Sequence, residues 1–260
     1  MKDYNHLKCP ISKTNKFRKI FTLKKFPIFM GVEKEKHKIE LKDMNFYVNK
    51  LTGTVQIFPR VPLKKLYYKS HGSGKIGSTW EQHHNKFFKY LKNNLKGKIV
   101  EIGGGHNSLI NNFKNLKINN NCNIISFEPN PSKKKLKNHK IIKKFFDNNS
   151  VKNSNIKRCD LVIHSHLFEH IYDPSKFLNL IKKILDNNGY HMFSIPNMKK
   201  MIQNNQSNAM NFEHPYYLEE ELIDELLKSS NFEVINKTYF KDHSIFYKTK
   251  LTKRKKEVKY

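Results

Sequence analysis

The chain has 260 residues, enough for one full α/β domain and a smaller lobe. No apolar run approaches the roughly 20 residues that cross a bilayer, and the polar N-terminus is not a secretory signal, so we expect a cytoplasmic protein without a membrane span. Three scattered cysteines exclude a disulfide framework and a Cys-x-x-Cys zinc site. The net charge of +28 comes almost wholly from lysine, with only four arginines. Because arginine makes the bidentate contacts to phosphates and bases, we expect no nucleic-acid partner, but a small, anionic substrate.

The first part of the chain, residues 1–66, contains short β-like runs, Phe46–Val48 and Thr54–Phe58, separated by turn signals and prolines. It predicts a small β-rich N-terminal lobe. Residues 67–85 include a stretch rich in Gly and Ser that ends near the only tryptophan, Trp80, and predict a linker or a lid over a ligand.

From residue 81 onwards, strand and helix patterns alternate. The predicted strands are Ile99–Ile102, Ile124–Phe127, Lys140–Lys144, Leu161–His164, Tyr190–Ile195, Phe232–Phe240 and Ser244–Lys248. The predicted helices are Glu81–Leu95, Asn107–Leu116, Asp173–Asp186 and Glu219–Leu227. This alternation predicts βαβ units, a mostly parallel sheet and an α/β fold. We expect residues 86–250 to form the ligand-binding domain and residues 251–260 to be a basic tail.

The sharpest motif is a glycine turn, Gly103-Gly-Gly105, which follows a short apolar strand. Glycine lets the backbone approach a ligand closely, and the next helix would present free N–H groups there. Position 108 is Ser, so the third glycine of a dinucleotide-binding fingerprint is missing. Glu101, inside the strand, is suited to orienting the turn or a ligand's ammonium group.

Two further segments follow predicted strands. Glu128, with Pro129 after it, closes the second strand, where a carboxylate can accept both hydroxyls of a ribose. Phe146 and Asp147 follow the third strand and either hold an adenine ring or are a core Phe and a surface Asp. The fourth strand leads into Ser165–His170, the predicted rim of the site at the carboxyl end of the sheet.

These motifs together resemble class I S-adenosylmethionine-dependent methyltransferases. The matching stretches are Val100–Gly105, Phe127–Pro129, Asp160–Pro174 and Gly189–Asn197. The resemblance implies a Rossmann-like seven-stranded sheet with helices on both faces and S-adenosylmethionine as the cofactor. It implies that the cofactor is bound by Glu101, Gly103, Gly105, Glu128, Pro129, Phe146, Asp147, Ser165 and His166.

A narrower resemblance covers most of the chain and is to sugar C-methyltransferases, which begin with a cysteine-bearing zinc lobe. Tyr67–Ser70 and Ser78–Trp80 look similar to a segment before their main domain, which adds Tyr68, Ser70 and Thr79 to the cofactor site. Asn211–Tyr217 is similar to their catalytic Tyr-His-Glu-His stretch and keeps Glu213 and His214. This chain departs from them in three ways: it has Asn211 at the tyrosine position, a single lobe cysteine and no second C-terminal domain.

These departures favour a relative that methylates oxygen or nitrogen of a sugar, nucleotide-sugar or phosphorylated precursor of a cell-surface polysaccharide, with no metal. Our hypothesis is that His214 is the base and that Glu213 holds the substrate or fixes the loop. His170 is a further candidate for catalysis, although it and His166 can equally be structural. Two alternatives remain: a non-catalytic S-adenosylmethionine-binding protein, and a metallohydrolase that uses His164, His166 and His170.

Overall fold

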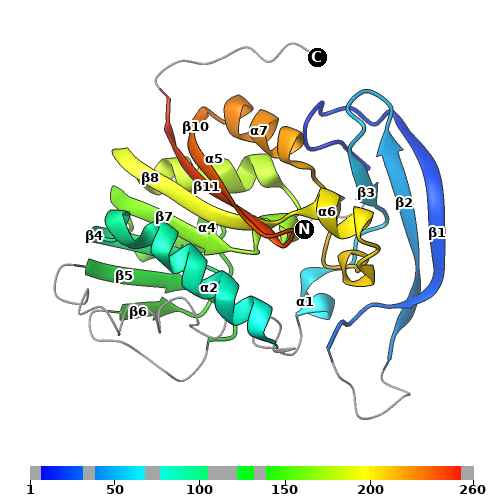
Figure 1. The fold of residues 1–260 in the computed structure, drawn as a ribbon, viewed down its shortest axis with the longest axis horizontal. Coiled ribbons are helices and arrows are strands. Elements are labelled where there is room, and N and C mark those ends of the chain that lie inside the picture. The colour runs from blue at the N-terminus through cyan, green and yellow to red at the C-terminus, as the bar shows by residue number, and fades with distance from the viewer. Residues whose placement is uncertain (1–6, 32–38, 68–76, 105–121, 132–138, 253–260) are drawn as a thin grey trace.

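The computed structural model describes residues 7–31, 39–67, 77–104, 122–131 and 139–252 (Figure 1). Its centre is a seven-stranded sheet in the order β10-β11-β8-β7-β4-β5-β6. The bounds are β4 Gly97–Ile102, β5 Cys122–Phe127, β6 His139–Ile142, β7 Cys159–Ser165, β8 Leu185–Pro196, β10 Phe232–Phe240 and β11 Ser244–Leu251. Strands β4 to β8 pair in parallel, and β11 lies antiparallel between β8 and β10. The predicted α/β class and seven-stranded sheet are confirmed.

Helices cover both faces of this sheet (Figure 1). On one face, α2 (Ser78–Leu91) packs Phe87 and Leu91 against Ile99 of β4. On the other face lie α4 (Asn148–Ser154), α5 (Pro174–Ile184) and α7 (Glu220–Ser229), whose apolar side chains belong to one core with Val100 of the same strand. Because successive strand residues point to opposite faces, each buried apolar strand contributes to two cores.

Most boundaries lie close to the predicted ones. Helix α5 starts as expected, with Asp173 accepting a hydrogen bond from the Lys176 backbone N–H at 3.0 Å, but it ends at Ile184 because Leu185 is already extended and begins β8. Helix α2 begins at Ser78, directly after Gly77, and not at Glu81. The predicted helix Asn107–Leu116 lies outside the described residues.

The N-terminal lobe is a separate antiparallel sheet, as predicted, in the order β1-β2-β3-β9. Its strands are β1 Phe17–Pro27, β2 Leu41–Asn49, β3 Val55–Ile57 and β9 Tyr216–Tyr217. The last strand comes from far along the chain and pairs with Val55 and Gln56. Buried Arg60 strengthens this junction, since its guanidinium donates to the Tyr216 hydroxyl at 2.6 Å and to the Tyr172 carbonyl at 3.1 Å.

The short helices α1 (Leu63–Leu66) and α6 (Met198–Gln203) complete the contact between the two sheets. Leu66, Met198 and Met201 share one apolar cluster with Met44 and Phe212. The lobe therefore holds the segment around residues 211–217 against the end of the central sheet. No helix in the described ranges is long and apolar enough to span a membrane.

Candidate active site

The glycine turn lies at the carboxyl end of β4. Gly103 has φ +71°, a conformation that side chains rarely adopt, and its N–H donates to the Phe127 carbonyl at 2.9 Å. A Cβ at Gly103 would lie 3.0 Å from Leu167, and one at Gly104 would lie 2.4 Å from the Glu101 carboxylate. Glycine is thus the residue that fits both positions without displacing a neighbouring side chain. Gly105 lies outside the described residues.

Glu101 is buried beneath this turn, where its Oε2 accepts a hydrogen bond of 2.7 Å from the Ser126 hydroxyl. Burial raises the pKa of Glu101 to about 7, and the nearby negative charge of Glu128 adds to the effect. Burial of the charged carboxylate is unfavourable because it loses its hydration. A positively charged group that binds beside it would therefore stabilise the charged form. The position suits a ligand's ammonium group.

The predicted ribose and adenine residues follow β5 and β6. Glu128, half-buried at the end of β5, accepts a hydrogen bond from the Asn130 N–H through one carboxylate oxygen at 2.8 Å. Asp147 caps helix α4, because its Oδ1 accepts from the Ser150 N–H at 2.8 Å. Phe146 packs on Phe127, with ring centroids 5.1 Å apart. A structural role therefore exists for both Phe146 and Asp147, and their contact with adenine stays a prediction.

The predicted lid residues Tyr68 and Ser70 lie outside the described residues, and Thr79 is exposed in the first turn of α2. Their neighbour Tyr67 is described, and its hydroxyl lies 3.1 Å from Nδ1 of His170. Tyr67 thus lies beside a predicted catalytic histidine.

The end of β7 separates two histidines that the metallohydrolase alternative needs together. His164 is fully buried and hydrogen-bonds His191, with 2.9 Å between the two Nε2 atoms. His166 follows the strand and has φ +47°, which turns the chain, and its ring packs 4.7 Å from that of Trp80. The set His164, His166 and His170 is therefore wrong as a group of metal ligands, since His164 belongs to the core.

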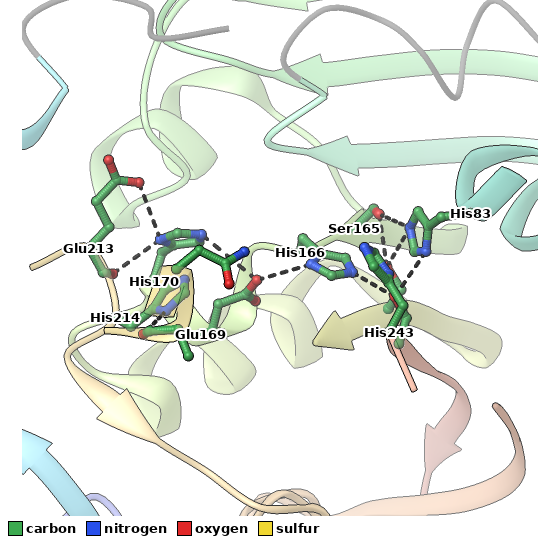
Figure 2. Close-up of polar contacts among 12 residues, drawn as sticks. His83, Ser165, His166, Glu169, His170, Glu213, His214 and His243 are labelled. Atoms are coloured by element: carbon green, nitrogen blue, oxygen red, sulfur yellow. Dashed lines mark hydrogen bonds and ion pairs between the residues drawn. The ribbon is translucent and has the colours of Figure 1, made fainter. Parts of the chain in front are cut away.

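A row of buried polar side chains runs along this edge of the sheet (Figure 2). His166 Nδ1 lies 3.5 Å from Glu169 Oε1, which lies 3.8 Å from His170 Nε2. On its other side, His170 Nδ1 lies 3.1 Å from the Glu213 carbonyl and 3.8 Å from Glu213 Oε2. The ring of His214 is 4.9 Å from that of His170. The three predicted catalytic residues are thus brought together, with Glu169 added.

Burial shifts the ionisation of this row. It lowers the pKa of His214 to about 3 and raises the pKa of Glu169 to about 8. The Nδ1 of His214 is 2.9 Å from the Ala209 carbonyl and 3.2 Å from the Asn211 amide nitrogen. When Nδ1 donates to the carbonyl, Nε2 is the nitrogen that can bind a proton or a ligand. Asn211, at the tyrosine position of the related enzymes, shapes the local turn, because its Oδ1 accepts from the N–H groups of Glu213 and His214.

At the other end of the row, three imidazoles surround one hydroxyl. Ser244 Oγ lies 2.9 Å from His166 Nε2, 3.0 Å from His83 Nδ1 and 2.5 Å from His243 Nδ1. Ser165 hydrogen-bonds His83 Nε2 at 3.1 Å. Burial lowers the pKa of His83 to about 2 and also lowers those of His166 and His243, which favours the neutral form of each ring. The predicted cofactor residues Ser165 and His166 are thus fixed by groups from α2 and β11.

Sequence reasoning missed His83, His243 and Ser244, which come from a helix and a hairpin turn with no motif around them. Glu169 lies in the predicted rim segment Ser165–His170, but no catalytic or binding role was predicted for it. In the lobe, the single cysteine, Cys9, contacts the hydroxyls of Thr52 and Thr54 at 3.3 and 3.8 Å. Within the described ranges, Cys9 is in no group of potential metal ligands.

The sequence matches a family described as "Methyltransferase domain" over residues 74–237, more than half of the chain. The chain belongs to this methyltransferase family, and its cofactor is S-adenosylmethionine. The sheet order, the glycine turn and the two carboxylates beside it fit this cofactor, because Glu101 offers a buried partner for its ammonium group and Glu128 lies where its ribose is expected. A search of curated proteins found no match.

Solved structures share the fold at low identity. A SAM-dependent methyltransferase from Aquifex aeolicus has a TM-score of 0.50 and 12% identity, covering 66% of this chain and 98% of that chain. The mitomycin 7-O-methyltransferase MmcR has a TM-score of 0.51 and 11% identity, covering 66% of this chain and 54% of that chain. The glycopeptide N-methyltransferase MtfA, complexed with S-adenosylmethionine, has a TM-score of 0.48 and 10% identity, covering 65% and 94%.

Proposed function

We propose that this methyltransferase modifies an oxygen or nitrogen of a small anionic acceptor: a sugar, nucleotide-sugar or phosphorylated precursor of a cell-surface polysaccharide. The observation that carries the proposal is the group of buried Glu169, Glu213 and His214 with half-buried His170 at the carboxyl edge of the sheet. Methyl transfer to a hydroxyl or an amine releases a proton, and this group offers the acceptors for it.

The cofactor supplies a methyl carbon that is electrophilic because it is bonded to a sulfonium. The acceptor's lone pair forms the new C–O or C–N bond, the electrons of the C–S bond stay on sulfur, and the acceptor loses its proton. Glu101 and the glycine turn hold the amino-acid end of the cofactor. His214 Nε2 and the Glu213 carboxylate are the candidate proton acceptors beside His170.

A negatively charged acceptor is supported by a basic cavity of about 550 Å³ between the lobe and helix α5. The cationic residues that line it are Lys8, Lys13, Arg60, Lys176 and Lys183. Tyr172 and Tyr216 also line it, and each lies two residues along the chain from a member of the buried group, His170 or His214. The positive charge of this cavity supports the proposal, because it would attract a phosphate or carboxylate.

The test is a screen with methyl-labelled S-adenosylmethionine and matched pairs of neutral and phosphorylated or nucleotide-linked sugars. We expect label in the anionic member of a pair, loss of transfer in H214Q, and unchanged transfer in E219Q, a control at an exposed carboxylate. Cofactor binding should survive in H214Q. Transfer confined to neutral sugars, or full turnover in H214Q, would contradict the proposal.

A further inference from the structure

Two buried groups and one half-buried group converge next to β7 and β9. The ligand atoms of Glu169, His170 and His214 all lie within 4.8 Å of one another. Glu169 and His214 are 7% and 8% exposed, and the side chain of His170 is 20% exposed. These residues come from two segments, the turn after β7 and the turn before β9, which the lobe holds together.

Backbone carbonyls fix the orientation of both imidazoles. His170 Nδ1 lies 3.1 Å from the Glu213 carbonyl, and His214 Nδ1 lies 2.9 Å from the Ala209 carbonyl. Two donors also reach these atoms, since the Tyr67 hydroxyl lies 3.1 Å from His170 Nδ1 and the Asn211 amide nitrogen lies 3.2 Å from His214 Nδ1. In the tautomer in which each Nδ1 donates to its carbonyl, each neutral ring has its lone pair on Nε2. This arrangement, Nδ1 on a carbonyl and Nε2 turned inward, is common for histidines that bind metals.

The third group is a carboxylate that faces these lone pairs. Glu169 Oε1 lies 3.8 Å from His170 Nε2, and Oε2 is buried without a hydrogen-bond partner in the described part of the chain. Electron pairs that face one another in a buried site need a positive charge between them. A shared proton would draw N and O to about 2.8 Å. A shared metal ion with bonds near 2.1 Å holds its ligands roughly 3.0–3.5 Å apart, which is closer to the observed separation.

We propose that Glu169, His170 and His214 bind a divalent transition-metal cation. Two imidazoles and one carboxylate form a donor set that suits such ions and leaves positions open for a further ligand. The inference rests on the proposed function in one respect: the open positions would take an oxygen of the acceptor's hydroxyl or phosphate. This proposed metal site differs from the prediction made from the sequence, which included no metal.

The neighbouring cluster of His83, His166 and His243 is the other group of potential metal ligands, and its hydrogen bonds favour the group around Glu169 as the cation site. Its three ring nitrogens already share the Ser244 hydroxyl, which can donate one hydrogen bond and accept two, so every group is satisfied. In the group around Glu169, the Tyr67 hydroxyl lies 3.1 Å from His170 Nδ1, but Glu169 Oε2 has no hydrogen-bond partner among the described residues. If both Nε2 atoms bound the ion, the Glu213 carboxylate, whose Oε2 lies 3.8 Å from His170 Nδ1, would stay beside the site.

The experiment uses the full chain, free of any histidine tag and stripped with chelator, titrated with Co²⁺ and followed by its visible absorption and by metal analysis. We expect one Co²⁺ per chain in the native protein. The variants E169Q and H214N should weaken binding by at least about 10- to 100-fold, the loss that even outer-shell partners of a metal produce. H243N is the matched control in the neighbouring cluster and should keep the native affinity. Thermal unfolding and cofactor binding establish that each variant is folded.

Absence of stoichiometric Co²⁺ binding to the native protein would overturn the inference, as would loss of binding in H243N with retention in H214N. If E169Q does not fold, H214N carries the same test. Methyl-transfer assays keep the two proposals separate. Bound metal without transfer to any anionic acceptor contradicts the proposed function alone, whereas full transfer by metal-free protein that binds no Co²⁺ contradicts the metal site alone.

Discussion

The variant E101Q should change folding stability and cofactor affinity in opposite directions. The carboxyl group is buried and its pKa rises from 4.5 to about 7, which corresponds to roughly 3 kcal/mol. Because the folded state favours the protonated acid, the folded protein binds more protons than the unfolded chain between these two pH values. Glu101 therefore makes the native protein less stable as the pH rises from 4.5 through 7.

Glutamine keeps the shape of the protonated acid and carries no charge. We expect E101Q to unfold at nearly the native denaturant concentration at pH 5 and to exceed native stability by about 2–3 kcal/mol at pH 8. Its affinity for S-adenosylmethionine should fall about 10- to 100-fold, since a buried charged hydrogen bond contributes about 1.5–3 kcal/mol.

The measurements are denaturant unfolding at pH 5 and pH 8 and calorimetric titration with the cofactor. E220Q is the control of opposite sign: Lys237 and Tyr239 bond Glu220 and hold its pKa below 4.5, so its loss should destabilise the protein above that pH. The reasoning is refuted if E101Q is less stable than the native protein at pH 8, or if it binds the cofactor equally well.

Three further outcomes follow from the same geometry. G103A and G53A impose similar backbone strain, at φ +71° and +69°, so both should lose about 1–2 kcal/mol of stability in denaturant unfolding. Only the new Cβ of G103A meets a side chain, so G103A alone should lose cofactor affinity in calorimetry. D147A should cost about 1 kcal/mol by removing the cap of α4, whereas D147N keeps the cap and reports by its cofactor affinity whether the carboxylate contacts adenine. K237M should lose about 1 kcal/mol at pH 7, a difference that shrinks as the pH falls below 4.5 because Glu220 becomes protonated; an unchanged difference at pH 3 would argue against the ion pair.

The central fold was predictable because its signals are local. Apolar runs such as Ile99–Ile102 and the proline after Asp173 mark strands and a helix start within a few residues. The helix ends were less accurate: nothing near Asp186 announces that Leu185 already belongs to the next strand, because the pairing partner Cys159 is remote in sequence.

The lobe and the catalytic row depend on contacts between distant segments. Tyr216 and Tyr217 complete the lobe's sheet only because Val55 and Gln56 offer an open edge. His214 could be proposed from the resemblance and His170 from its place in the predicted rim, but the contacts of their Nδ1 atoms with the carbonyls of Ala209 and Glu213 could not.

The His164-x-His166 spacing, on which the metallohydrolase alternative depends, fails to predict a pair of metal ligands for a related reason. In a regular strand the two side chains would share a face, but the strand ends at Ser165 and the positive φ of His166 redirects its ring toward Trp80. Sequence spacing carries no information about such a local change in backbone conformation, so the metal-ligand pattern read there was wrong.

Central to the proposed function is the claim that the glycine turn and Glu101 bind S-adenosylmethionine. Calorimetric titration of the native protein and of G104V with the cofactor and its demethylated product tests it most directly, because a side chain at Gly104 would collide with the Glu101 carboxylate. We expect one site per chain for both ligands in the native protein and no measurable binding in folded G104V. Native-like affinity in G104V, or no binding of either ligand to the native protein, would contradict the claim.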